Sequence, residues 1–311
     1  MTRLPFAMPA KAAIFAALVG FTLSYVAVFV ASLRRSRSQK TTLTPSALQV
    51  ATGFVTNFFD TLGIGSFATT TAIFKFKRMV PDELIPGTLN VGHTLPTIFQ
   101  AFIYVSAIEV DFLTLVLLIA SAVAGSWVGA GLVVRLSRRT VQLCVGTALL
   151  VAAVAMLMRQ FALFPLGGES LQLRGWRLAA GMSGNFVFGA VSTLGIGFYA
   201  PCMTLVSLLG MNPVAAFPIM MGSAAFLMPV ASIRFVWSRA YFARAAAGLA
   251  IGGLFGVPLA AFVVKSLPLT ALRWLVIVIV LYAAVLMLRS ALAGALFLRA
   301  SGDQKKFSDE A

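Results

Sequence analysis

The sequence predicts an all-α polytopic membrane protein, with two repeats of four apolar segments each and one additional N-terminal transmembrane helix. Three observations predict this fold class. First, 60% of the residues are hydrophobic and only 11% are charged, whereas a soluble domain carries about 25% charged residues. Second, apolar runs of about 20 residues, long enough to cross a bilayer, recur along the chain. Third, the pentapeptide Thr-Leu-Gly-Ile-Gly occurs twice, at Thr61–Gly65 and at Thr193–Gly197.

The N-terminal segment is predicted to be a retained transmembrane helix. Its apolar run covers residues 12–33 and is followed by the basic residues Arg34, Arg35, Arg37 and Lys40. A cleaved signal peptide has a shorter apolar core, of about 7–15 residues, before a small-residue cleavage site. Residues 1–44 therefore form a helix and a basic loop that lie outside the repeats.

Further apolar segments follow, separated by polar or charged residues. They cover residues 45–74, 84–107, 112–134, 140–158, 177–209, 213–233, 241–264 and 270–288. We assign the first four to a membrane repeat over residues 45–160 and the last four to a second repeat over residues 175–290. Residues 291–311 are predicted to form a polar cytosolic tail.

The two repeats match beyond the pentapeptide. At the same spacing, five pairs of identical residues align: Ala68 with Ala200, Met79 with Met211, Pro81 with Pro213, Pro86 with Pro218, and Leu95 with Leu227. The first segment of each repeat, 45–74 and 177–209, is too long for one simple span of about 20 residues. Because both of these segments carry Gly-Ile-Gly, we predict that each is a helix pair broken at the glycines.

The distribution of Lys and Arg favours re-entrant helix pairs. If each broken segment returns to the face it entered, each repeat makes an odd number of crossings and the two repeats are inverted. If both segments cross fully, the repeats are parallel. The re-entrant scheme collects more Lys and Arg on the side of residues 34–40 and places Glu109 and Asp111 opposite, as the positive-inside rule favours.

The broken segments are predicted to bind a small anion near the bilayer midplane. Glycine weakens a helix interior, and an opened helix in a membrane is tolerated where protein or a water-filled cavity satisfies its backbone. Ser66 is expected to cap the half-helix after the first break, and a helix N-terminus favours anions. The candidate binding residues are Thr61, Gly63, Gly65, Ser66, Asn90, Thr193, Gly195, Gly197, Phe198, Tyr199 and Ser223. The alternative is that the glycines only allow close helix packing.

Asp60 and His93 are the candidates for coupling transport to protons. Asp60 is an acid inside an apolar segment, where ionisable residues are costly and indicate function, and its counterpart in the second repeat is Ser192. His93 is the sole histidine, and imidazole exchanges protons near neutral pH. The alternatives are that Asp60 only caps the broken helix and that His93 only bonds a neighbouring helix.

The composition excludes several other functions. The net charge of +15 lies in short clusters of Lys and Arg between apolar runs, which indicates topology and not a nucleic-acid partner. Cys144, Cys202 and His93 are too few and too far apart for a metal site or a disulfide framework. Because no nucleophile motif or nucleotide loop accompanies Asp60, we expect no enzyme activity, no metal and no cofactor. The expected partners are the lipid bilayer and a small-anion substrate.

At these residues the chain resembles the TauE/SafE sulfite exporter family of anion permeases. The resemblance covers roughly residues 45–290 and rests on the twin glycine breaks, the paired prolines and two close-packing glycine pairs, Gly125/Gly129 and Gly252/Gly256. It implies secondary transport of sulfite, sulfoacetate or related sulfonates across a bacterial inner membrane, driven by an ion gradient. The alternatives are a permease for another small organic or inorganic anion, a non-transporting membrane partner and an intramembrane enzyme.

Overall fold

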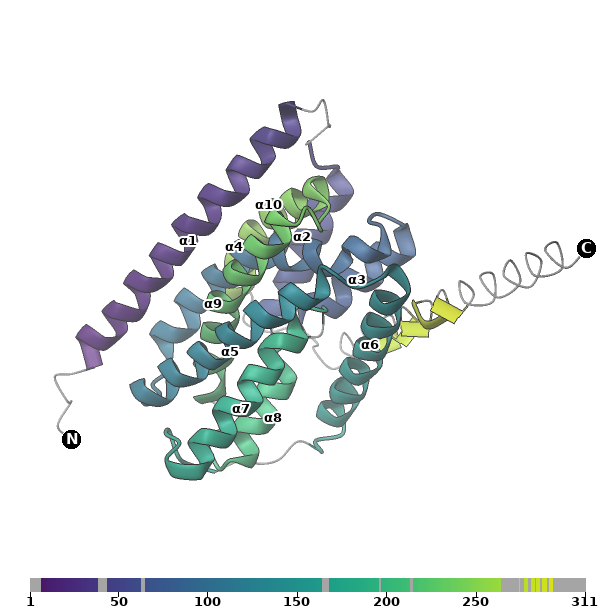
Figure 1. Ribbon diagram of the computed structural model, residues 1–311. Coiled ribbons are helices and arrows are strands. Elements are labelled where there is room, and N and C mark those ends of the chain that lie inside the picture. Colours follow the sequence, from purple (N-terminus) through teal and green to yellow (C-terminus); the bar gives the residue numbers. More distant parts are fainter. Residues whose placement is uncertain are drawn as a thin grey trace, which may run out of the picture.

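The computed structural model confirms the all-helical prediction over the residues that it describes (Figure 1). These are residues 7–38, 44–62, 65–163, 168–195, 197–212 and 215–263, together with short stretches between 274 and 292. Within these ranges the elements are helices, and one isolated β-bridge joins Ser170 to Met211. Most of the predicted segment 270–288 and the polar tail from residue 293 lie outside the described residues.

The helices follow the predicted apolar segments in order. They are α1 (Ala7–Ser38), α2 (Ala47–Thr61), α3 (Ser66–Lys77), α4 (Ile85–Ala107), α5 (Phe112–Val133), α6 (Arg138–Gln160), α7 (Gly175–Ser192), α8 (Tyr199–Leu208), α9 (Ala216–Trp237) and α10 (Ala243–Pro258). A 3-10 turn, Asp82–Leu84, precedes α4, and a π-helical turn, Leu259–Val263, follows α10. Both long segments are broken at the repeated pentapeptide, as predicted.

Four helices in the described part of the chain are long and apolar enough to cross a membrane. They are Ala12–Arg34, Phe112–Val133, Ala216–Trp237 and Ala243–Phe262. The 23-residue α4 is as long as these helices, but its polar residues lower its hydropathy. Those residues are buried inside the protein: Thr88, Asn90, His93, Thr94, Thr97 and Gln100. Helix α4 is therefore an apolar helix with one polar, inward-facing side.

The helices pack in two equivalent pairs, α2 against α10 and α7 against α5. In the first pair, a Cβ added to Gly256 would collide with the carbonyl oxygen of Phe54. In the second pair, a Cβ added to Gly125 would collide with the carbonyl oxygen of Phe186. Phe54 and Phe186 are separated by the same interval as the two pentapeptides. This reciprocal close packing supports the predicted duplication, and it agrees with small residues at membrane helix interfaces.

The two ends of the α2–α3 pair are each fixed by a polar contact to a neighbouring element. At the start of α2, where Ser46 and Gln49 form a capping box, the Thr44 carbonyl accepts a hydrogen bond from Arg244 at 2.7 Å. At the end of α3, Lys75 forms an ion pair of 2.7 Å with Asp82. Arg244 lies in the first turn of α10, and Asp82 lies just before α4.

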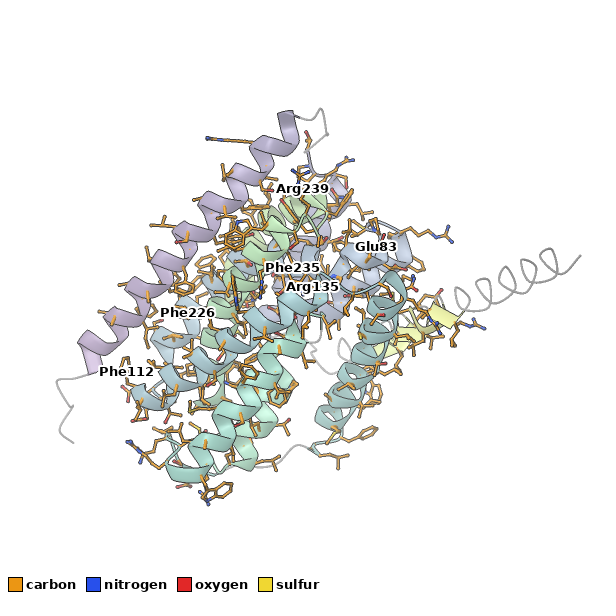
Figure 2. All side chains as sticks on the ribbon, viewed as in Figure 1. Glu83, Phe112, Arg135, Phe226, Phe235 and Arg239 are labelled. Atoms are coloured by element: carbon orange, nitrogen blue, oxygen red, sulfur yellow. The ribbon has the colours of Figure 1, made fainter. Side chains whose placement is uncertain are left out.

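The two ends of the α7–α8 pair lie together beside the loop between α4 and α5. Before α7, Arg174 is 3.5 Å from Asp111 in that loop. After α8, the Asn212 amide donates to the Ser170 carbonyl at 2.8 Å. Figure 2 labels Phe112 at the end of α5 beside this loop and Arg135 beyond the opposite end of the same helix. Both ends of the α7–α8 pair therefore lie near the start of α5.

The additional helix α1 lies along the outside of the bundle (Figure 1). It packs on the central helices α4 and α9. Tyr25 is buried and donates its hydroxyl to the Val91 carbonyl of α4 at 2.6 Å, and Ser32 bonds Tyr241 at 2.7 Å. Helix α1 therefore supports α4 from outside, through a tyrosine that needs a polar partner when buried.

Candidate functional site

The two helix breaks are the first part of the candidate site. The backbone angle φ is +91° at Gly65 and +95° at Gly195, a conformation that favours glycine because it has no Cβ. A Cβ added at Gly65 or Gly197 would meet no atom within 4 Å, so open space lies beside both breaks. Gly63 lies outside the described residues.

Asp60 closes the first break from the end of α2. Its side chain is buried, and its Oδ1 accepts a hydrogen bond from the Ser66 amide at 2.7 Å. The prediction that Ser66 caps α3 is wrong, because Gly65 is the cap residue and makes no side-chain cap hydrogen bond. A carboxylate is a stronger acceptor for a helix N-terminus than a hydroxyl. Asp60 therefore occupies the position at the start of α3 where an external anion was expected.

The second break has no such carboxylate. Ser192, the counterpart of Asp60, donates its hydroxyl to the Gly189 carbonyl at 2.9 Å. Helix α8 begins at Tyr199, and its cap residue, Phe198, makes no side-chain cap hydrogen bond. Thr193 likewise bonds back into its own helix, donating to the Ala190 carbonyl at 2.7 Å. The α8 N-terminus is therefore the half-helix end that is better suited to an anion from outside.

Gln100 joins the two breaks, and the sequence interpretation missed it. Its Nε2 donates to Asp60 Oδ2 at 2.9 Å and to Thr61 Oγ1 at 3.0 Å. Its Oε1 accepts from the Tyr199 hydroxyl at 3.3 Å. A signal was present in the sequence, because Gln100 lies seven residues after His93 and therefore on the same face of α4.

Two other predicted residues lie on the central helices. Asn90 donates to the Pro86 carbonyl at 2.8 Å and to the Thr193 carbonyl at 3.3 Å, so α4 also contacts the second break. The Asn90 Oδ1 atom is buried without a hydrogen-bond partner. Ser223 is buried on α9, and its Oγ also has no partner. Buried polar atoms without partners are rare in native proteins, and such atoms need an explanation such as a ligand or water.

His93 connects the first broken pair to α4. Its Nδ1 lies 3.0 Å from Asn57 Oδ1 of α2, and its Nε2 lies 2.9 Å from Thr70 Oγ1 of α3. Asn57 donates its amide to the Gly53 carbonyl at 2.7 Å, which leaves Oδ1 as the acceptor. This arrangement fits a neutral imidazole that donates from Nδ1 and accepts at Nε2. The contacts support the interpretation of His93 as a cross-link between three helices.

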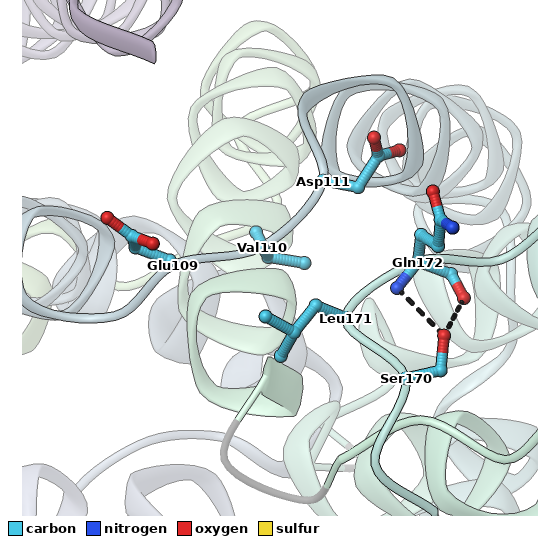
Figure 3. Close-up of a pocket in the computed structure, with 6 residues that line it drawn as sticks. All are labelled: Glu109, Val110, Asp111, Ser170, Leu171 and Gln172. Carbon is cyan, nitrogen blue, oxygen red and sulfur yellow. Dashed lines mark hydrogen bonds between the residues drawn. The ribbon is translucent and has the colours of Figure 1, made fainter. Parts of the chain in front are cut away.

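A separate surface cleft of about 410 Å³ lies at the loop between α4 and α5 (Figure 3). Its lining residues are Glu109, Val110, Asp111, Ser170, Leu171 and Gln172. Two carboxylates among these six residues make the cleft unfavourable for an anion. Asp111 has a local role, because its Oδ2 accepts from the Thr114 amide at 3.0 Å and caps α5. The cleft is therefore not the candidate anion site.

The fold and the site define a helical, multi-pass membrane protein with two broken helix pairs around a buried polar centre. Among the described residues, no group of three His, Cys, Asp or Glu side chains could hold a metal ion. A family model described as Sulfite exporter TauE/SafE matches residues 4–156, and this is the family that the duplicated motifs resemble. This match covers α1 to most of α6. Searches of curated proteins and of solved structures found no match.

Proposed function

We propose that the protein is a secondary transporter of small sulfur-containing anions, such as sulfite, sulfoacetate or related sulfonates, in a bacterial inner membrane. The observation that carries this proposal is the hydrogen-bond chain from Asp60 through Gln100 to Tyr199. It brings the two breaks of the repeated pentapeptide together at one buried centre. The TauE/SafE match supports an anion, and specifically sulfite, as the substrate class.

The proposed anion site lies between the two breaks. Helix N-termini offer free amide donors and about half a positive charge. The open space beside Gly65 and Gly197 provides room next to these donors. Within the set predicted from the sequence, we expect the backbone around Gly197 and Phe198 to bind the anion first. We expect the start of α3 to bind the anion only after Asp60 moves or takes up a proton.

The positions of the helix ends support inverted, re-entrant repeats. The α2–α3 pair begins at Thr44, which accepts from Arg244 of α10, and ends with the basic Lys75, which pairs with Asp82. The α7–α8 pair begins and ends near the start of α5, beside Asp111 and Ser170. Two hairpins that enter from opposite faces would place their tips together near the midplane. Paired broken helices of this kind form the substrate sites of other secondary transporters.

Cysteine labelling tests the proposed topology. Single cysteines at Arg34, Lys75, Lys77 and Arg138, in a background without Cys144 and Cys202, should all react from the cytoplasmic side. A cysteine at Trp176, which is 72% exposed next to the start of α7, should react only from the opposite side. Opposite labelling of Arg34 and Lys77 would instead show that the first broken pair spans the membrane fully.

Transport assays in proteoliposomes test the proposed function. Purified protein should carry sulfite across the bilayer, and a proton gradient should drive its accumulation above the level in protein-free liposomes. Sulfoacetate should compete with sulfite, whereas an organic cation of similar size should not. If sulfite flux equals that of protein-free liposomes under either gradient polarity, the proposed substrate class is wrong. Flux of other small anions in the same vesicles would then support the more general permease.

A further inference from the structure

Three side chains from three helices form one chain of hydrogen bonds across the two breaks. Asp60 lies in the last turn of α2, Gln100 lies on α4 and Tyr199 begins α8. Asp60 and Gln100 are at most 1% exposed. Gln100 has one donor group, which faces Asp60, and one acceptor, which faces Tyr199. The orientation of the Gln100 amide, that is, whether Nε2 or Oε1 faces Asp60, therefore depends on whether Asp60 accepts or donates a hydrogen bond.

The ionised and protonated forms of Asp60 favour opposite orientations of this amide. An ionised carboxylate only accepts, so Gln100 Nε2 must face it and Oε1 must face Tyr199. The Tyr199 hydroxyl then donates to Gln100, and its proton is not available to a ligand. A protonated carboxyl donates to Oε1 of a turned amide, and Nε2 then donates to the Tyr199 oxygen. The Tyr199 O–H is then free to donate to another acceptor.

We propose that Asp60, Gln100 and Tyr199 form a latch that couples uptake of one proton to binding of the substrate anion. This inference rests on the proposed function. A proton from the solvent forms the O–H bond on Asp60 Oδ2, the Gln100 amide turns, and the Tyr199 hydroxyl donates to the anion at the start of α8. Release reverses these steps, and the proton leaves Asp60 on the other side. No other covalent bond forms or breaks.

The surroundings of Asp60 suit this role. From α4, Tyr104 donates to the Thr61 carbonyl at 2.6 Å, and from α8 Tyr199 interacts with both Asp60 and Gln100. One turn back along α2, His93 is held through Asn57. In the described part of the chain, the ion pairs and hydrogen bonds of Asp60 include no Lys or Arg. The carboxylate of Asp60 is therefore stabilised by hydrogen bonds from neutral donors, and such donors can change partners.

The Gln100→Leu and Tyr199→Phe variants test the latch in sulfite transport assays at mildly acidic and neutral pH. Acidification should lower the KM for sulfite in the unmodified protein, and this decrease should be about tenfold larger than the decrease in either variant. One hydrogen bond to a charged ligand changes affinity by about that factor. Sulfite itself changes protonation in this range, so each variant is compared with the unmodified protein in the same solutions. The pH dependence of KM in the double variant should be reduced no further than in the more strongly affected single variant.

Two matched controls keep the test specific. Gln142→Leu removes a buried glutamine that donates to another aspartate, Asp82, at 2.7 Å. Tyr25→Phe removes a buried hydroxyl that donates to a carbonyl outside the breaks. Both controls should keep the pH dependence of the unmodified protein. If Gln100→Leu and Tyr199→Phe also keep it, the latch is wrong. If the unmodified protein carries no sulfite, the proposed function itself fails.

Discussion

The Asp60→Asn variant should lose proton-driven accumulation of sulfite, by at least about tenfold, while exchange of sulfite across the membrane continues. Asparagine has nearly the same shape, and its oxygen can still accept from the Ser66 amide, which Asp60 binds at 2.7 Å. It cannot take up or release a proton. Its amide also favours the turned orientation of Gln100, so the variant resembles the protonated protein. Flux driven by a pH gradient and counterflow at equal pH, measured in the same vesicles, separate coupling from binding.

Asp82→Asn and His93→Gln are the comparisons for this experiment. Asp82 is also a partly buried aspartate that accepts from a glutamine, but it lies outside the breaks, so its variant should accumulate sulfite normally. His93→Gln should keep proton coupling. Its free energy of unfolding should fall by about 1–3 kcal/mol, because Asn57 or Thr70 loses a buried hydrogen-bond partner. Normal accumulation by Asp60→Asn would exclude proton carriage by Asp60. If proton-driven accumulation is lost in His93→Gln and kept in Asp60→Asn, His93 carries the proton instead.

The Gly125→Ala and Gly256→Ala variants should each lower the stability of the folded protein by about 1–3 kcal/mol, the usual cost of overpacking a tight interface. The added methyl group would collide with the Phe186 carbonyl in the first case and with the Phe54 carbonyl in the second. Backbone atoms cannot move aside as a flexible side chain can. Thermal unfolding in detergent, followed by size-exclusion chromatography, measures the loss.

Gly20→Ala is the matched control for this pair. It also lies inside a long apolar helix, but a Cβ there would meet no atom within 4 Å. Alanine has the higher helix propensity, by about 1 kcal/mol, so this variant should be as stable as the unmodified protein or slightly more stable. Equal stability of all three variants would contradict the close packing of α5 on α7 and of α10 on α2.

Local sequence features predicted the helices and their breaks correctly. A long apolar run needs only its own composition to identify a membrane helix, and a glycine pair weakens a helix wherever it lies. The helices therefore end at Thr61 and Ser192 and restart at Ser66 and Tyr199, beside the two copies of the pentapeptide. The glycine pairs Gly125/Gly129 and Gly252/Gly256 also marked close helix contacts correctly.

The side-chain partners at the site could not be predicted in this way. Ser66 was the nearest residue of the right type to cap α3, but Asp60 reaches across the break and is the better acceptor. His93 was singled out for its chemistry, and the structure surrounds it with neutral partners on two other helices. Gln100 was overlooked because nothing near it in the sequence indicates which helix it faces.

By itself, the sequence determined a helical membrane protein that resembles the TauE/SafE family and carries two copies of a glycine-broken motif. These properties depend on composition, on local backbone preference and on repetition, all of which are visible in the chain. Only the tertiary structure decided that the two breaks meet through Gln100 and that Asp60 and Tyr199 share one hydrogen-bond chain. Those contacts join residues that are far apart in the sequence, so they exist only once α2, α4 and α8 have packed together.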